Sequence, residues 1–228
     1  MKIKYYFRLL SALILLAGCE CVPGIDTPKI VEPQNYSKIN IINALTDSDK
    51  ISFLSNDAII FDTLGYSNST ADYKKILSGT SGFQVLTLPD STIVFNSSFY
   101  LENEKSYSMI VFGKKTKTRI ILLDDMLPAK DTSKFYIRFA NCTQTFSEVK
   151  FQLNNAAFEQ QVSYKFYTNN FALSPVTSSV KILDTSNNVL AEIPVYNFLA
   201  NRLYTIVFRN IKTSGGQKND CFISVNKL

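Results

Sequence analysis

An internal repeat constrains the fold more than any other feature of this 228-residue sequence. Residues 39–44 match residues 137–142 at an offset of 98 residues. The same offset carries three later residues onto similar ones: Ile51 onto Val149, Phe53 onto Phe151 and Asn56 onto Asn154. Because self-similarity at a fixed offset indicates a duplicated structural unit, we predict two copies of about 90–100 residues, a normal size for a domain.

Each copy consists of short segments that are rich in β-branched and aromatic residues and are separated by turn residues. The segments predicted as strands cover residues 38–43, 50–54, 58–62, 83–88, 92–96, 106–112 and 118–123 in the first copy, and 135–140, 148–153, 164–168, 178–183, 189–195, 203–208 and 221–226 in the second. Apolar residues alternate with polar ones in several of them, for example at Phe83 and Val85. About seven such strands per copy predict an all-β chain with two tandem antiparallel β-sandwiches.

The N-terminal 19 residues, MKIKYYFRLLSALILLAGC, have the order of charged and apolar residues that is typical of an export signal. Three basic residues precede an apolar run, residues 9–17, that is too short to span the ~30 Å hydrocarbon core of a membrane. The run ends in Leu-Ala-Gly-Cys, which resembles the bacterial lipobox. The resemblance implies cleavage before Cys19 and a lipid anchor on its thiol. The alternatives are an ordinary signal peptide with a chance cysteine and a buried N-terminal helix.

We therefore divide the sequence into a signal peptide (1–18), a lipidated tether (19–36) and two β-sandwich domains (37–126 and 134–228). Three prolines recur every five residues in the tether, which disfavours a helix and favours extended chain. At ~3.1 Å per residue, such a tether reaches up to roughly 50 Å from the lipid surface. We expect the protein in the cell envelope, anchored to the outer membrane, with the periplasmic or surface face undetermined.

Composition argues against several classes of function. The chain has 17 Phe and 12 Tyr but no His, so it lacks the most frequent general base and the most common metal ligand. The predicted signal contains three basic residues, so the formal charge of +5 falls to +2 in the rest of the chain. No basic run is longer than Lys114-Lys115. We therefore predict no metal, no cofactor and no nucleic-acid partner.

No motif in the sequence selects catalytic residues. G-x-S-x-G, P-loop, Cys-x-x-Cys and H-E-x-x-H patterns do not occur. The acidic pairs at residues 47–49 and 124–125 lack the glycine and closing glutamate of an EF-hand loop, so we interpret them as surface turns. Paired carboxylates for glycoside hydrolysis remain open, but nothing in the sequence selects a pair. The chain is predicted not to be an enzyme.

Two tyrosines indicate how the sandwiches are closed. Tyr107 and Tyr204 each follow a polar turn and lie at the start of an apolar strand. Immunoglobulin-like sandwiches use a tyrosine at this place as a corner, in which the phenol bonds back to the backbone of the preceding turn. The alternative is an ordinary strand tyrosine.

The order of several short motifs resembles a known family. The motifs are I-x-I-x-N-A at residues 39–44, Y-x-x-I-x-x-G at 73–79, Y-S-M-I-V-F-G at 107–113, L-L-D-D at 122–125 and F-Y-I-R-F-A-N at 135–141. Together they resemble the family named domain of unknown function 4397, whose members are commonly secreted or lipid-anchored proteins of Bacteroidetes-type bacteria. The resemblance covers residues 37–153 and implies immunoglobulin-like or transthyretin-like β-sandwiches; the second copy lacks the central glycine motif. The family has no established activity, so function stays open.

Two cysteines of the second copy are candidates for a disulfide. Cys142 ends the first predicted strand of this copy and Cys221 begins its last, and such strands can be neighbours in a sandwich. Export permits disulfides, and a bridge across a loop of ~80 residues would stabilise the fold by about 4 kcal/mol. The alternative is that both are buried free thiols.

Two stretches mix aromatic residues with Asn and Ser, residues 95–100 and 164–171. Within them we select four candidate binding aromatics: Phe99, Tyr100, Tyr164 and Tyr167. Exposed tyrosines beside amides suit stacking on sugar rings or recognition of a protein. The alternative is that these rings fill the two cores.

These features together predict a non-catalytic envelope lipoprotein that is held to the membrane through Cys19. Its two sandwiches would bind or adhere to a glycan or a protein. One alternative is a structural or accessory subunit of a surface fibre or envelope complex, which would need an exposed edge strand. The other is a glycan-handling enzyme, which would need a cleft with two facing carboxylates.

Overall fold

The computed structural model describes residues 35–227, apart from 48–49, 71, 128–130 and 155–156. The predicted signal peptide, Cys19 and most of the predicted tether lie outside the described residues. Asn35–Leu228 form one compact unit. Among the described residues, no helix is long and apolar enough to cross a membrane.

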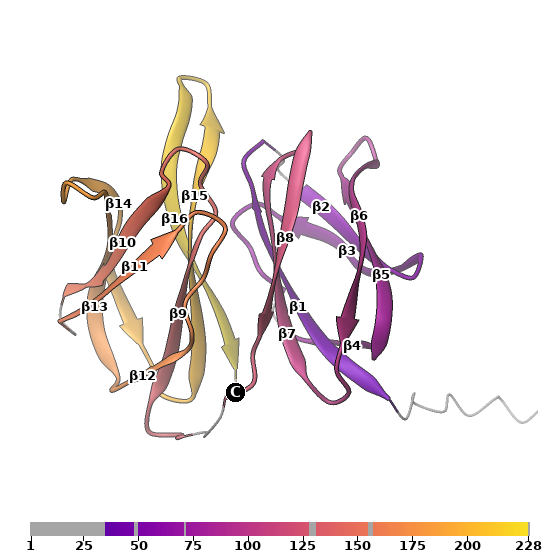
Figure 1. Ribbon diagram of the computed structural model, residues 1–228, viewed down its shortest axis with the longest axis horizontal. Coiled ribbons are helices and arrows are strands. Elements are labelled where there is room, and N and C mark those ends of the chain that lie inside the picture. Colours follow the sequence, from indigo (N-terminus) through magenta and orange to yellow (C-terminus); the bar gives the residue numbers. More distant parts are fainter. Residues whose placement is uncertain (1–34, 48–49, 71, 128–130, 155–156, 228) are drawn as a thin grey trace, which may run out of the picture. The chain divides into compact units, whose positions relative to one another are not determined.

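Strands make up the regular structure of this unit (Figure 1). The first copy contains β1 (Tyr36–Leu45), β2 (Lys50–Ser55), β3 (Ala58–Gly65), β4 (Lys74–Leu77), β5 (Gly79–Thr87), β6 (Thr92–Leu101), β7 (Ser106–Lys114) and β8 (Lys117–Asp124). The second contains β9 (Phe135–Asn141), β10 (Glu148–Leu153), β11 (Phe158–Ser163), β12 (Phe171–Leu173), β13 (Val176–Leu183), β14 (Val189–Phe198), β15 (Arg202–Thr213) and β16 (Gly216–Lys227).

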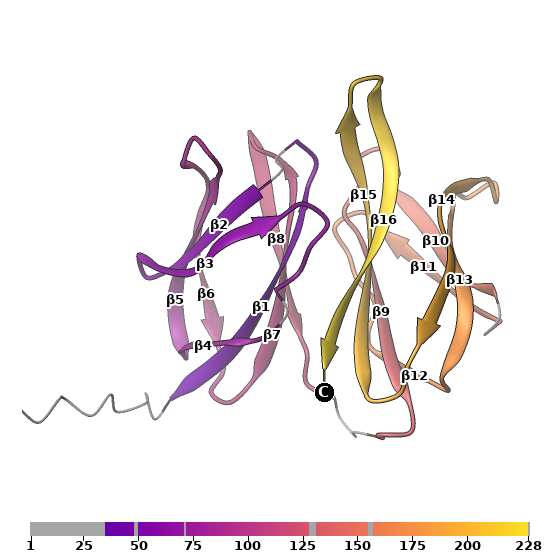
Figure 2. The same cartoon turned by 180° about the vertical axis from the view of Figure 1, so that it is seen from behind.

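Each copy is a sandwich of two four-stranded sheets (Figures 1 and 2). The sheets of the first copy have the orders β4-β1-β7-β8 and β3-β2-β5-β6. Those of the second have the equivalent orders β12-β9-β15-β16 and β11-β10-β13-β14. The prediction of two β-sandwiches is confirmed. A parallel pairing of the first strand with the seventh, β1 with β7 and β9 with β15, was not predicted.

Each sandwich has its own apolar core between its two sheets. In the first, fully buried side chains such as Ile39, Phe53 and Phe83 come from both sheets. In the second, Phe139 and Phe151 do the same, and their ring centroids lie 4.8 Å apart. Because burying one such side chain contributes about 1.5–3 kcal/mol, these cores are the main source of stability of each sandwich.

Equivalent asparagines show that the repeat extends to individual hydrogen bonds. Asn43 and Asn141 are 98 residues apart, and each lies near the C-terminal end of the first strand of its copy, β1 or β9. The side-chain oxygen of each accepts a bond of 3.2 Å from the backbone N–H two residues later. The side-chain nitrogen of each donates to backbone carbonyls 21 residues later, those of Leu64 and Val162. The predicted repeat is therefore present in the structure.

The two predicted tyrosine corners are confirmed. The Tyr107 hydroxyl accepts a hydrogen bond of 3.1 Å from the backbone N–H of Glu102, and the Tyr204 hydroxyl accepts one of 2.9 Å from Leu199. A third phenol of this kind, that of Tyr136, accepts a bond from the N–H of Asp131. Each corner fixes the turn that precedes a buried strand.

The predicted strand at residues 164–168 is wrong. β11 ends at residue 163, and the chain then turns, because Lys165 has a positive φ of 68° and the N–H of Phe166 bonds back to Ser163. Three outer strands, β4, β11 and β12, were also not predicted. The spacing of the aromatic residues in 164–168 is typical of a strand, but the backbone of these residues forms a turn.

Candidate functional site

The central strands β1, β7 and β9 are buried on both faces. Their inner faces contribute to the two cores. Their outer faces form a third apolar cluster that joins the two sandwiches, which we call the junction. Its buried members are Ile42, Ala44, Ile110, Phe112, Ile121 and Leu123 of the first sandwich and Ala140, Cys142 and Val207 of the second.

Arg209 on β15 is the first of two fully buried arginines at the junction. Its guanidinium lies 3.8 Å from the ring centroid of Tyr66 and 4.7 Å from that of Phe222. It also pairs with Asp220 at 3.1 Å and donates to the backbone oxygen of Asn43 in the first sandwich at 3.3 Å. Buried arginines are rare unless they are paired, and the guanidinium of Arg209 has hydrogen-bonding partners in both sandwiches.

Arg138 on β9 is the second buried arginine and belongs to a polar network. It pairs with Asp125 at 2.5 Å, and the two side chains are only 2% and 1% exposed. The other carboxylate oxygen of Asp125 accepts hydrogen bonds from Tyr73 at 2.6 Å and Ser108 at 2.7 Å. Asn226, at the C-terminal end of β16, donates to the same oxygen at 3.4 Å. This network connects β8, β9 and β16.

The junction has an approximate two-fold relation between the copies. The register pairs Asn43 with Val111 and Asn141 with Phe208, so Phe112 and Arg209 occupy equivalent places. Each receives a tyrosine from the other sandwich: Arg209 stacks on Tyr66, and Phe112 makes an edge contact with Tyr164 at 6.5 Å. These two tyrosines are 98 residues apart in sequence. The outer face of each copy thus covers that of the other.

A groove of about 390 Å³ opens beside the Arg138 network. We call it the junction groove; its lining residues are Asp124, Met126, Arg138, Tyr167, Thr168, Asn169 and Asn170. Asp124 ends β8 of the first sandwich and Met126 follows it, whereas the others belong to the second sandwich. The carboxylate of Asp124 is held by Lys105 at 3.2 Å and by the N–H of Met126 at 2.8 Å. The volume is that of a site for a small ligand.

The four aromatic residues predicted for binding lie in two different environments. Phe99 packs against the first core, and Tyr164 packs against the junction cluster, as the alternative interpretation expects. Tyr100 on β6 is 69% exposed, and Tyr167 is 45% exposed in the junction groove. Tyr167 is thus both exposed and one of the residues that line the junction groove. A fifth ring, that of Phe166, is 66% exposed and was part of the stretch but not selected.

The predicted disulfide between Cys142 and Cys221 is not formed, and both thiols are free. Strand β15 lies between β9 and β16 in the sheet. Cys142 points to the junction, whereas Cys221 packs toward the core of the second sandwich. Two strand spacings amount to about 9–10 Å, more than the Cα separation that a disulfide allows. The prediction failed because a strand separates the two cysteines and they face opposite sides of the sheet.

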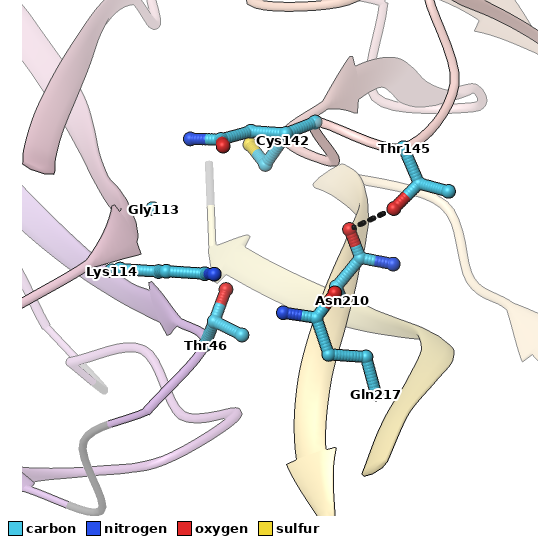
Figure 3. A pocket seen from close by; sticks show the side chains of 8 residues that line it. Thr46, Gly113, Lys114, Cys142, Thr145, Asn210 and Gln217 are labelled. Carbon is cyan, nitrogen blue, oxygen red and sulfur yellow. Dashed lines mark hydrogen bonds between the residues drawn. The ribbon is translucent and has the colours of Figure 1, made fainter.

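Cys142 lines a small cavity of about 50 Å³ (Figure 3). Thr46, Gly113 and Lys114 approach it from the first sandwich, and Asn210 and Gln217 from the second. The space is sufficient for no more than one or two water molecules. Burial raises the pKa of the Cys142 thiol far above its usual range. Since a thiolate is the reactive form, this cysteine is a structural residue.

Sequence reasoning missed the residues that form the junction. Asp125, interpreted as part of a surface turn, is buried and carries the ion pair with Arg138. Arg138 and Arg209 were not selected at all. One signal was present: residues 109–112 are apolar on both faces of a strand, which is typical of a strand that is covered on both sides.

Comparisons with solved structures find low similarity over most of the chain. The Bacillus anthracis TIE protein has a TM-score of 0.26 and 10% identity over 78% of this chain, which spans 33% of that one. A CBM26 module from Eubacterium rectale Amy13K, in complex with maltoheptaose, has a TM-score of 0.25 and 10% identity, covering 85% and 97%. A protein provisionally assigned to cell adhesion from Bacteroides eggerthii has a TM-score of 0.24 and 8% identity, covering 85% and 96%. These TM-scores are too low to bear on function.

Comparison with protein families gives a definite result, whereas a search of curated proteins finds no match. The model of one family, described as domain of unknown function (DUF4397), matches residues 37–152. The match begins in β1, includes the whole first sandwich and reaches β10 of the second. It therefore contains Asp125 and Arg138, the two sides of the buried ion pair. Because it covers half of the sequence, this chain belongs to the DUF4397 family.

Proposed function

We propose that this chain is a lipid-anchored envelope protein that binds a glycan or protein partner without catalysis. The observation that carries the proposal is the exposed ring of Tyr167, which lines the junction groove, together with the exposed ring of the preceding residue, Phe166. Neither ring makes a contact with another aromatic ring in the described part of the chain. Large rings that are exposed beside polar groups are frequent anchors in binding sites.

The contacts between the two sandwiches support the same proposal. The junction combines an apolar cluster with two arginines that are each bonded to groups of the other sandwich. A partner that contacts both Met126 and Tyr167 therefore meets a preformed surface and does not have to order two loosely linked domains. Preorganisation of this kind increases affinity by reducing the entropy lost on binding.

The lipid anchor is supported by the lipobox-like sequence before Cys19. The test compares three forms of the full chain in the native host: wild type, Cys19→Ala and the neighbouring Cys21→Ala as the matched control. Membrane fractionation and protease accessibility on intact cells are measured. We expect wild type and Cys21→Ala in the outer-membrane fraction and Cys19→Ala released from it. Release of all three, or retention of Cys19→Ala, would contradict the anchor.

Binding itself is tested on whole cells that display the wild-type chain or Phe166→Ser/Tyr167→Ser. Retention of the cells on immobilised glycans and host proteins is measured at equal surface amounts. The proposal expects retention of wild-type cells on at least one surface and a clear loss in the double variant. Equal retention of both would show that these rings are not the anchors.

A second candidate function rests on the outer strand β6. This strand has ten residues, lies at the edge of its sheet and exposes Ile93 and Tyr100 by more than half. An exposed edge strand can pair with a neighbouring chain in a fibre or complex. Chemical crosslinking on intact cells, with Ile93→Lys as the disrupting variant, tests this. Crosslinked multimers of wild type that disappear in the variant would favour the structural role.

A further inference from the structure

We propose that the junction groove binds a neutral carbohydrate, with the ring of Tyr167 as the stacking platform. This inference rests on the proposed binding function and names the class of ligand and the site. Asn169 and Asn170 would provide amide donors and acceptors, and Asp124 a carboxylate acceptor, toward the hydroxyl groups of the sugar.

Comparison of the two copies shows that the fold does not need an aromatic residue at position 167. In the first copy the turn has the sequence Tyr66-Ser-Asn-Ser-Thr70, and in the second it has Tyr164-Lys-Phe-Tyr-Thr168. The second residue of both turns has a positive φ, 56° and 68°. The last Thr accepts a bond of 3.1 Å from the backbone of the first strand in both copies.

The fourth residue of each turn also makes the same contact with the first strand. Ser69 forms an isolated β-bridge with Ile42, and Tyr167 forms one with Ala140. A serine therefore maintains this backbone in one copy and a tyrosine in the other. Because the larger ring is exposed and is not required by the turn, packing does not explain it. Its position in the groove indicates contact with a ligand.

The charge of the groove favours a neutral ligand. The charge of Arg138 is offset by Asp125 at 2.5 Å, and that of Asp124 by Lys105 at 3.2 Å. An acidic or basic ligand would find no unpaired opposite charge among these four. The side-chain oxygen of Asn170 is buried and has no hydrogen-bond partner among the described residues. Such an acceptor is costly unless a donor reaches it, and a sugar hydroxyl is one.

The same lining argues against a protein partner in the groove itself. Asp is depleted at the centres of protein interfaces, whereas the carboxylate of Asp124 lines this groove. The concave shape and a volume of about 390 Å³ are typical of small-ligand sites. The lining combines one aromatic face with several amides and a carboxylate, and this combination matches the mixed apolar and hydroxyl surface of a sugar ring.

The test uses the full chain, purified in detergent, on an array of neutral, acidic and basic oligosaccharides. Saturation-transfer NMR then measures the affinity for the best neutral ligand. Tyr167→Ser introduces the residue of the first copy and should weaken binding at least about tenfold, the effect of losing a central aromatic anchor. Val195→Ser, at a 71% exposed residue of β14, is the control and should bind like wild type.

The outcomes separate this inference from the proposed function. Tenfold or greater loss in Tyr167→Ser with folded protein, shown by an unchanged circular dichroism spectrum, supports the groove. Binding of sugars that Tyr167→Ser does not weaken overturns the groove but leaves a glycan-binding protein. Absence of any glycan binding, together with retention of wild-type cells on a protein surface, overturns the carbohydrate and leaves the binding function. Absence of binding to every surface overturns both.

Discussion

The buried pair between Asp125 and Arg138 allows a quantitative test of the junction. The change Asp125→Asn keeps the shape of the side chain but removes its charge. One oxygen of Asp125 faces Arg138, and the other accepts bonds from Tyr73 and Ser108. The new amide nitrogen must face donors on one of these sides. The variant therefore removes the acceptor either of the guanidinium nitrogen that faces Asp125 or of the two hydroxyls.

The size of the effect follows from burial. With side chains 2% and 1% exposed, the pair is shielded from water, and removal of one partner of a buried pair costs about 3–5 kcal/mol. In a domain of this size, 1 kcal/mol corresponds to about 2–4 °C in the melting temperature, so we expect a decrease of roughly 6–20 °C. Asp124→Asn is the matched control, because Asp124 is 44% exposed and its pair with Lys105 is worth about 0–1 kcal/mol.

The assay is thermal unfolding of the full chain, followed by circular dichroism, with urea titration for the free energy of unfolding. A double-mutant cycle with Arg138→Met isolates the pair, and we expect a coupling energy of about 0.5–3 kcal/mol. The reasoning would be refuted if Asp125→Asn melted like Asp124→Asn. It would equally be refuted if the effects of Asp125→Asn and Arg138→Met were additive.

Three further predictions concern single residues of the fold. Tyr204→Phe removes a corner hydrogen bond and should lower the free energy of unfolding by about 0.5–1.5 kcal/mol, whereas the exposed Tyr100→Phe should have no effect in the same urea titration. Gly113→Ala places Cβ 2.6 Å from a backbone oxygen at a φ of +97°, so its melting temperature should fall further than that of Gly79→Ala, where no atom lies within 4 Å. Burial, and secondarily a neighbouring carboxylate, raise the pKa of Tyr73 above its usual value. The folded state therefore favours the neutral phenol, and this part of the free energy of unfolding is fully present below the unfolded pKa of about 10. It is lost as the pH rises above that value, so the urea midpoint should fall between pH 9 and 11. Tyr73→Phe should make that fall less steep, and an unchanged slope would contradict the assignment.

Local patterns made the sandwiches predictable. The alternation at Phe83 and Val85 puts both side chains in the core, because successive residues of a strand point to opposite faces. The corner tyrosines were predictable for a similar reason, since each bonds to a backbone group only five residues away. Such features depend on sequence neighbours, and the sequence contains all the information that they need.

The junction was not predictable from local patterns. Arg138 lies on the outer face of β9, where a charged residue normally faces water, and Asp125 follows directly after an edge strand. Their burial depends on the second sandwich covering the first, which no sequence neighbour reveals. The disulfide failed for a related reason, because the facing of Cys142 and Cys221 depends on the register of β15 with both of its neighbours.

The two-fold relation at the junction explains why one copy would carry the binding groove. In both copies an equivalent asparagine bonds to the end of the third strand and an equivalent threonine ends the turn that follows it, so the residues between these anchors are free to differ. In the first copy this turn contributes to the junction, since Tyr66 stacks on Arg209. In the second copy, Tyr164 makes the equivalent contact with Phe112, while Tyr167 faces the groove. The groove also needs Asp124 and Met126 from the end of the first copy. A single copy could therefore form the turn but not the groove, and binding at Tyr167 would require both sandwiches in their docked arrangement.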